Sequence, residues 1–205
     1  MAIQSFALTT VARVKSRLEI DSGTTTWDAL LAELINGMSS FIEGEAGRRL
    51  VSAVYTNEAY TLDDGQTILM LRQYPVTAIA SIQFRAGSVA TPAWTTLTAD
   101  EWEQQNSGRD DLGIIRLYMS LRGTNAIRVT YTAGYTINFT TEASHTLPYE
   151  LSDLCERLVA RRFKKRESEG KASEGASAGG TLAWEKEMSD DDKRILRRYI
   201  RSAFL

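Results

Sequence analysis

The side chains with the clearest chemical potential are basic, and they gather in two segments late in the sequence. One segment lies on a predicted helix over residues 148–167, and the other lies on a predicted final helix that begins at Ser189. Clustered guanidinium and ammonium groups bind carboxylates or phosphates. The first segment contains Arg157, Arg161, Arg162, Lys164, Lys165 and Arg166, and the second contains Lys193, Arg194, Arg197, Arg198 and Arg201.

Two interpretations of these basic segments remain open. Cations near the end of a helix can complement its dipole on a solvated face, without any partner. Alternatively, they form a surface for an acidic protein partner or for DNA. For the second segment we expect docking, because Phe204 and Leu205 follow the arginines directly and place an apolar end behind them, as in a docking peptide.

Other candidate sites have less support. Residues 44–49 contain two glycines but lack the Lys-Ser/Thr ending of a phosphate loop, so we expect them to end a helix. Asp pairs at 63–64 and 110–111 suit turns better than metal binding or carboxylate catalysis. His145 has no Ser or Cys motif beside it, and Cys155 falls on an apolar helix stripe, which predicts an inert thiol. The sequence therefore predicts no enzyme, no cofactor and no metal site.

Composition narrows the protein class. The 205 residues include 24 Lys plus Arg and 26 Asp plus Glu, so the formal net charge is −2. This balance gives no global attraction to nucleic acid or to an anionic membrane. One cysteine excludes an intrachain disulfide, no apolar run approaches the roughly 18 residues of a membrane helix, and no signal-peptide pattern is present. We expect an unprocessed intracellular protein without a membrane segment.

Hydrophobic periodicity predicts the helices and strands that position the basic segments. Helical spacing predicts helices from Thr10 to Leu18, from Thr25 to about Gly44, over 148–167 and from Ser189 onward. Alternation of apolar and polar residues and the turn dipeptide Asp64-Gly65 predict antiparallel strands between the second and third helices. The expected strands lie at 50–62, 67–72, 79–84, 93–97, 113–118 and 126–132.

This order predicts an α+β fold that is mainly α, in which the N- and C-terminal helices form a bundle with an inserted antiparallel β region. The expected parts are the N-terminal bundle helices (1–49), the β region (50–146), a bundle helix (147–167), a flexible Gly/Ser/Ala-rich linker (168–188) and a basic docking helix (189–205).

Several stretches together resemble the head–tail connector (adaptor, or head-completion) proteins of tailed bacteriophages and prophages. The likeness lies in the order and spacing of these stretches over roughly residues 8–167, and the linker and the final helix match less distinctively. The stretches are Leu8 to Asp21, Trp27 to Ile35, Ile42 to Leu50, Leu69 to Ile82 with its Pro75-Val76-Thr77-Ala78-Ile79 motif, Val129 to Tyr135, and Leu147 to Leu151.

The resemblance implies a structural virion protein made in the bacterial cytoplasm. Such connectors assemble as a ring, typically of about twelve copies, under the portal protein. The ring extends the DNA channel and receives the next neck, stopper or tail protein, with at most weak nonspecific contact with channel DNA. The final basic helix, with Phe204 and Leu205, would dock on the portal. The basic helix at 148–167 would face a partner or DNA.

Two other functions compete with this interpretation. A DNA-binding module would use the two basic helices, but the balanced net charge and the lack of a recognisable recognition helix count against it. Another neck or tail-completion protein, such as a tail terminator, is also consistent with a virion role. The helix–sheet–helix order favours the adaptor.

Overall fold

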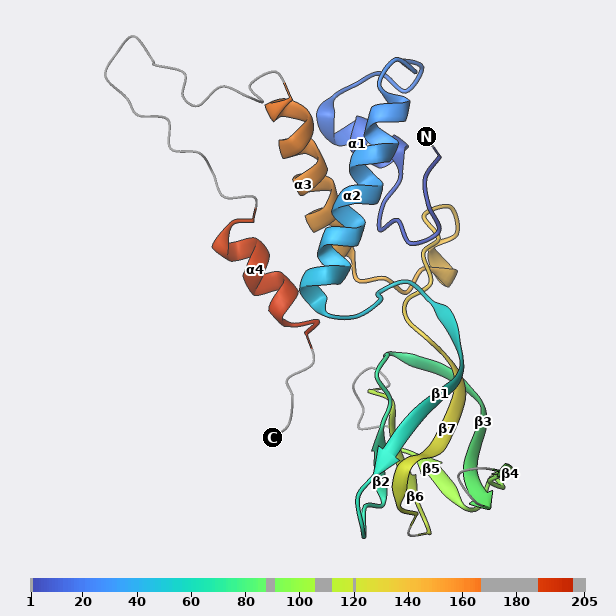
Figure 1. The fold of residues 1–205 in the computed structure, drawn as a ribbon. Coiled ribbons are helices and arrows are strands. Elements are labelled where there is room, and N and C mark those ends of the chain that lie inside the picture. Colours follow the sequence, from blue (N-terminus) through green and yellow to red (C-terminus); the bar gives the residue numbers. More distant parts are fainter. Residues whose placement is uncertain (1, 88–90, 106–111, 120, 167–187, 201–205) are drawn as a thin grey trace. The chain divides into compact units, whose positions relative to one another are not determined.

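A computed structural model describes residues 2–87, 91–105, 112–119, 121–166 and 188–200 of the chain. The chain divides into two compact units (Figure 1). We call the first, Met1–Arg48 with Thr146–Leu205, the helical unit, and the second, Arg49–His145, the β unit.

The described part of the helical unit contains four α-helices: α1 (Val11–Leu18), α2 (Asp28–Ala46), α3 (Tyr149–Lys165) and α4 (Asp190–Arg197). As expected, α1 follows Thr10, whose side chain accepts a hydrogen bond from the Arg13 backbone N–H. The second helix starts later than the sequence suggested: its N-cap is Trp27, which makes no side-chain capping bond, rather than Thr25.

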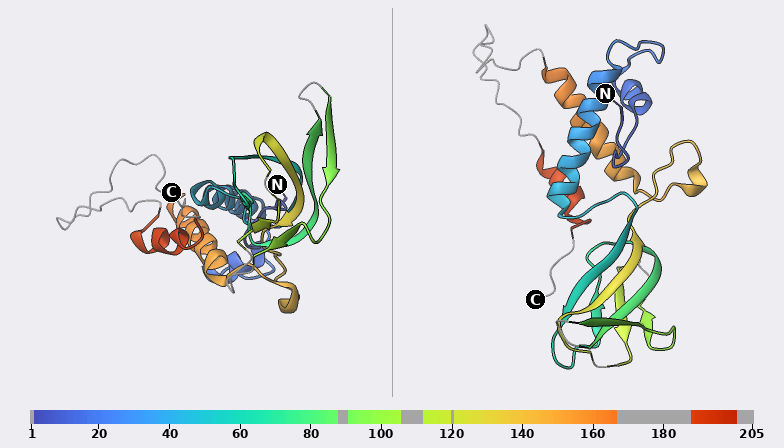
Figure 2. Two further views of the ribbon diagram at one scale, coloured as in Figure 1. Left: turned by 90° about the horizontal axis from the view of Figure 1, so that it is seen from below. Right: turned by 45° about the vertical axis from the view of Figure 1, so that its right-hand side comes forward.

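The core of this unit forms where α2 and α3 pack along each other (Figures 1 and 2). Leu31, Ile35 and Ile42 of α2 and Leu154 and Leu158 of α3 are buried there, because apolar residues three, four or seven apart share one helix face. The N-terminal segment is tied to the same core, since the Leu8 backbone N–H donates to Ser39 Oγ at 3.0 Å.

Within the residues that the structure describes, the β unit contains seven strands in two antiparallel sheets. One sheet has the order β1-β7-β3-β4 and the other has the order β2-β6-β5. A 3₁₀ turn, η1 (Glu142–Ser144), follows them. The strands are β1 (Ala53–Leu62), β2 (Ile68–Met70), β3 (Val76–Gly87), β4 (Pro92–Thr96), β5 (Trp102–Gln104), β6 (Ile114–Leu117) and β7 (Gly123–Ala133).

Strand β7 lies between β1 and β3 and shows how the sequence pattern becomes a core. Ile127, Val129 and Tyr131 point inward and are essentially inaccessible to solvent, whereas Arg128 and Thr130 are only partly buried. The expected alternation of this strand is confirmed. Both sheets contribute to one hydrophobic core, which includes Ile82 of β3 and Ile115 of β6.

The two chain segments that bound the sheets are joined side by side. The Tyr135 N–H donates to the Leu50 carbonyl at 2.7 Å, and the Ser52 N–H donates to the Tyr135 carbonyl at 2.9 Å. Gly134 has a φ of +110°, and a Cβ at this position would lie 2.7 Å from the Val51 backbone. A residue without a Cβ is therefore needed for the two segments to approach this closely.

The expectation of a mainly α chain is wrong. Among the residues that the structure describes, strands account for about 29% and helices for about 33%. The physical reason is that β1, β3 and β7 are long and pair into a sheet that shares a core with the second sheet, so the β segment is a unit in its own right.

Some sequence expectations fall on residues that the structure does not describe. The expected linker at 168–188 lies outside the described residues except for Met188, and the final segment is described only as far as Ile200. Among the helices that are described, none combines the length and the apolar character needed to span a membrane.

Candidate functional site

The candidate site is centred on α4, which begins with a capping box. Ser189 Oγ accepts a hydrogen bond from the Asp192 N–H at 3.2 Å, and Asp192 Oδ2 accepts one from the Ser189 N–H at 3.0 Å. This reciprocal pair satisfies two donors at the start of a helix that has only eight residues. The same Asp192 carboxylate also contacts α3.

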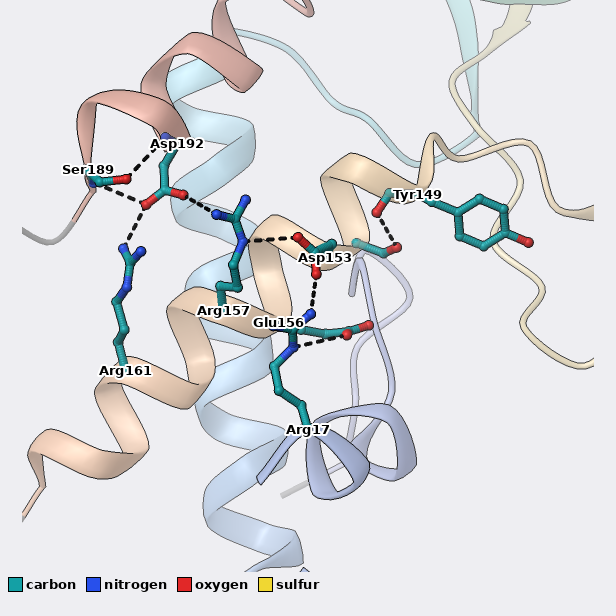
Figure 3. A network of polar contacts seen from close by, with 9 residues as sticks. Arg17, Tyr149, Asp153, Glu156, Arg157, Arg161, Ser189 and Asp192 are labelled. Carbon is teal, nitrogen blue, oxygen red and sulfur yellow. Dashed lines mark hydrogen bonds and ion pairs between the residues drawn. The ribbon is translucent and has the colours of Figure 1, made fainter. Parts of the chain in front are cut away.

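Asp192 binds two arginines of α3 (Figure 3). Arg161 Nη1 donates to Oδ2 at 2.7 Å, and Arg157 Nη1 forms an ion pair with Oδ1 at 2.9 Å. The Asp192 side chain is fully buried, while each arginine is about one quarter exposed (27% and 26%). Burial acts to raise the pKa of Asp192, but the hydrogen bonds from Arg161 and Ser189 outweigh it and hold the pKa below its ordinary value.

The ionic contacts continue from α3 to α1. Arg157 Nε lies 3.0 Å from Asp153 Oδ2, and Arg17 pairs with the other oxygen of Asp153. Arg17 also lies 3.5 Å from Glu156 Oε2, and Arg13 Nε donates to Glu156 Oε1 at 2.6 Å. Opposite charges thus alternate from α4 across α3 to α1, so the ionic contacts link these three helices.

Two hollows lie along the junction of α1 and α3, and together we call them the α1–α3 groove. They share Arg17, and each has a volume of about 320–330 Å³. Five cations and one carboxylate line the groove, so its walls are mainly positive. The lining residues are Arg17, Arg157, Ala160, Arg161 and Lys164 in one hollow, and Arg13, Ser16, Arg17 and Glu156 in the other.

The remaining basic residues of α3 point elsewhere. Arg162 is exposed, whereas Lys165 and Arg166 are partly buried. The Arg166 guanidinium lies 4.8 Å from the ring centre of Trp27 and 4.0 Å from that of Phe163. It therefore covers the aromatic pair at one end of the helical unit, in a cation–π arrangement.

The basic residues expected to dock on a partner lie on the open side of α4. Arg194 pairs with Asp191, and both side chains are about three quarters exposed. Arg198 Nη1 donates to Glu150 Oε2 at 3.2 Å, and the Tyr199 hydroxyl donates to Glu150 Oε1 at 2.5 Å. Lys193, Arg194, Arg197 and Arg198 are all exposed, and Arg201, Phe204 and Leu205 lie outside the described residues.

The weaker candidates take structural positions. Gly47 forms the C-cap of α2 with a φ of 65°, as expected for a segment that ends a helix, and Arg48 Nε donates to the Tyr199 carbonyl. Cys155 is completely buried, and burial raises the pKa of its thiol to about 12. His145 Nδ1 accepts from the Asn138 N–H. In the described part of the chain, no group of acidic, His and Cys side chains could hold a metal ion.

Sequence reasoning missed the part played by Asp192. It placed Asp190, Asp191 and Asp192 together as acids in a first helical turn, yet only Asp192 is buried and paired with α3. The available signal was the Ser-x-x-Asp spacing of a capping box, combined with two arginines four residues apart on α3.

Comparison with known proteins was made for sequence and for fold. No protein-family model matches the chain, and no curated protein matches it. A solved structure described as "Virion of native gene transfer agent (GTA) particle" contains a chain that superposes with a TM-score of 0.58. The two chains share a fold. The match covers 100% of this chain and 95% of that chain, at 17% sequence identity.

Proposed function

We propose that this chain is a structural, non-enzymatic protein of a phage-like virion, and that it acts as a head–tail connector (adaptor). The observation that carries the proposal is a fold match to a chain of a gene transfer agent virion that spans the entire length of this protein. The order of sequence stretches that resembles connector proteins supports the same role independently, because it depends on residue types and spacing and not on the fold.

In this role, copies of the chain form a ring, of about twelve subunits by resemblance, under the portal protein. The ring extends the DNA channel and receives the next neck or tail protein. We assign portal docking to the exposed basic side of α4 and to the residues that follow it. Lys193 and Arg197 are exposed on α4, so they can meet an acidic partner without breaking the packing of this helix.

Charge reversal on α4 tests the docking surface. The variant Lys193→Glu with Arg197→Glu changes two exposed side chains and leaves the Asp192 contacts in place. We expect it to keep the fold and lose association with portal rings, measured by co-sedimentation. The matched control, Arg116→Glu with Arg122→Glu, makes the same charge change on exposed residues of the β unit and should still bind.

Two results would count against the proposal. If the unaltered chain does not associate with portal rings of its own particle, the connector role is wrong. If the α4 variant binds as well as the control, the connector role survives but the docking surface is elsewhere. Deleting residues 189–205 is a less selective test, because it also removes the partner of Arg157 and Arg161.

A further inference from the structure

The outer face of the four-stranded sheet presents no carboxylate on its described strands. Strands β1, β7, β3 and β4 lie side by side in this sheet (Figure 1), and together they contain a single acidic residue, Glu58. Glu58 lies opposite Val129, whose side chain belongs to the core, so its carboxylate is on the inner face. The nearest acids in the sequence lie beyond the ends of β1 and β4: Asp63, Asp64, Asp100 and Glu101.

The outer face carries an arginine that its neighbours hold in place. The Arg128 guanidinium lies 4.3 Å from the ring centre of Trp94, and Arg128 Nε donates to Gln83 Oε1 at 2.6 Å. Gln83 is itself fixed, because its Nε2 donates to Thr96 Oγ1 at 3.0 Å. Within the described part of the chain, neither Nη nitrogen of Arg128 has a hydrogen-bond or ion-pair partner. Both nitrogens can therefore bind an anion without breaking a contact.

A second arginine lies beside the first on the same face. Arg85 is opposite Trp94 in the β3–β4 register, and Gln83, two residues before it, is opposite Arg128 in the β3–β7 register. Arg85 and Arg128 are thus diagonal neighbours, a relation that places residues about 7–8 Å apart. Neither forms an ion pair with a described residue. Their positive charges are therefore not neutralised on this surface.

The other polar side chains of the face are neutral hydrogen-bonding groups. The cross-strand registers place them in rows with the arginines, and they are Ser81, Gln83, Thr96 and Thr130. Arginine, serine, threonine and glutamine are among the side chains that contact the phosphate oxygens of nucleic acids. The composition of the face therefore fits a phosphate backbone.

We propose that the outer face of the β1-β7-β3-β4 sheet binds the phosphate backbone of duplex DNA without sequence preference. The inference goes beyond the proposed function, because it assigns a partner to a surface of the β unit. It rests on that function only for the source of the duplex, which in a connector ring is the DNA of the channel. Binding of duplex and association with portal rings can therefore fail separately.

The geometry favours a duplex over a single strand and over an acidic protein. Single strands bind mainly by stacking bases on aromatic rings, but the Arg128 guanidinium already covers the Trp94 ring. An acidic protein needs cations matched to a few fixed carboxylates. This face offers mostly neutral donors with two unneutralised arginines, which suits phosphates that repeat at a regular interval.

Salt-dependent binding is the first test, with fluorescence anisotropy of a short labelled duplex and the full chain. Two phosphate contacts correspond to about a 60-fold loss of affinity when salt rises tenfold. The variant Arg85→Gln with Arg128→Gln should bind at least about tenfold more weakly at low salt and lose most of this dependence. The matched control, Arg116→Gln with Arg122→Gln, changes exposed residues elsewhere in the β unit and should bind as the unaltered chain does.

Two further variants separate charge from folding. Arg85→Lys with Arg128→Lys keeps both charges, so its affinity should stay within about threefold of that of the unaltered chain. Arg85→Gln alone removes no described side-chain hydrogen bond and should reduce the salt-dependent change to about eightfold. If the double Gln variant loses the circular dichroism of the sheet, this single variant decides. Unchanged binding by folded Gln variants would overturn the proposal.

Site-directed cross-linking locates the duplex on the chain. The native Cys155 is buried, so a cysteine introduced at an exposed position can be labelled selectively with a photoactivatable azide. Labelled Thr96→Cys, on the proposed face, should cross-link to duplex DNA at low salt. Labelled Thr67→Cys is the control, since Thr67 is exposed and lies outside this sheet. Equal yields from the two positions would contradict the proposal.

The remaining explanations give different results. If Lys193→Glu with Arg197→Glu abolishes duplex binding and the double Gln variant does not, the duplex binds α4 and the proposal is wrong. If single-stranded DNA or polyglutamate displaces the duplex at a lower concentration of charge than unlabelled duplex does, the face prefers another partner and the proposal is also wrong. If the duplex binds as expected but portal rings do not, only the connector role is refuted.

Discussion

At the scale of single residues, Asp192 shows how a buried charge is kept in a small helical unit. Its carboxylate has no solvent exposure but receives two arginines and a backbone N–H. Removing one member of such a group leaves the others charged and poorly solvated, which costs more than the intact group contributes. The docking of α4 on α3 therefore depends more on Asp192 than on the exposed residues near it.

The first prediction concerns Asp192→Asn. The amide cannot balance the charges of Arg157 and Arg161, so we expect a loss of about 2 kcal/mol in the stability of α4 docking. Faster amide exchange confined to α4 would show this loss. Asp191→Asn is the matched control, because Asp191 is about three quarters exposed and should change stability very little. Equal effects of the two substitutions would refute the assignment.

The second prediction is a pH dependence of α4 docking. The pKa of Asp192 is lowered in the folded chain, so its contribution is complete above the unfolded-state value and is lost as pH falls through the folded value. We expect α4 protection to be constant down to about pH 5 and to decline below about pH 4. Amide exchange, corrected for its intrinsic rate, measures it. A similar decline in Asp192→Asn would show that another group is responsible.

Residue types in the candidate site were predictable, but their partners were not. The sequence places Arg157, Arg161 and Lys164 on one helix with a spacing that indicates a shared face. It does not reveal that the first two face Asp192, because that contact joins residues about 30 positions apart and depends on how α4 packs. Long-range charge pairing is decided by tertiary structure, which local periodicity does not encode.

At the scale of elements, β1 and β7 are joined by a partly buried polar group in which two core tyrosines contact the Glu58 carboxylate. The Tyr131 hydroxyl donates to Glu58 Oε2 at 2.5 Å, Tyr60 donates to the same oxygen, and Arg72 Nη1 donates to Oε1 at 3.1 Å. Burial acts to raise the pKa of Glu58, but these hydrogen bonds outweigh it and hold the pKa below its ordinary value. The group links the two strands to the segment after β2.

The third prediction concerns Tyr131→Phe. The change removes a donor to the Glu58 carboxylate and an acceptor for the Gln73 N–H, so we expect about 2 kcal/mol lower stability of the β unit in urea. The pKa of Glu58 should rise, since one hydrogen bond that lowers it is lost. Tyr118→Phe is the control: its hydroxyl also contacts a carboxylate, of Glu103, but the residue is 60% exposed.

An equal loss of stability in Tyr118→Phe would contradict this interpretation. The Tyr118 side chain is exposed, so water can take the place of its hydrogen bond to Glu103, and little stability should be lost. Carboxyl chemical shifts of Glu58 measured across the acid range report the pKa change directly. An unchanged pKa in Tyr131→Phe would mean that the remaining contacts with Tyr60 and Arg72 determine it.

Elements with strong local signals were predictable. Thr10 as the cap of α1 and the inward alternation of β7 both follow from the sequence, because each depends on residues close together in the chain. The start of α2 was misplaced by about one turn. Three consecutive threonines, Thr24 to Thr26, each offer a capping hydroxyl, and the sequence alone does not decide between capping and turn formation.

At the scale of the whole molecule, the error in fold class has a physical origin. Strand segments are short or alternate in polarity, so each contributes less to a sequence pattern than a long amphipathic helix does. Pairing of β1, β7, β3 and β4 over many residues is visible only in three dimensions. The β region was therefore recognised as an insertion, but its weight in the fold was underestimated.

The fourth prediction follows from the separate core of the β unit. Residues 49–145, expressed alone, should fold cooperatively with the circular dichroism of an antiparallel sheet, because their buried side chains pack among themselves. Urea unfolding should give one transition. Tyr131→Phe should lower its midpoint in the fragment as it does in the full chain. A fragment without sheet signal would show that the β unit needs the helical unit to fold.

The joined segments at Leu50 and Tyr135 have a consequence for how such a protein can evolve. A sheet module whose entering and leaving chain segments are hydrogen-bonded to each other needs only one attachment point on its host. The host helices can then keep their packing while the inserted module is lengthened, shortened or exchanged for another one with the same closely spaced ends. Gly134 is required for this arrangement, because a side chain at this position would push the two joined segments apart.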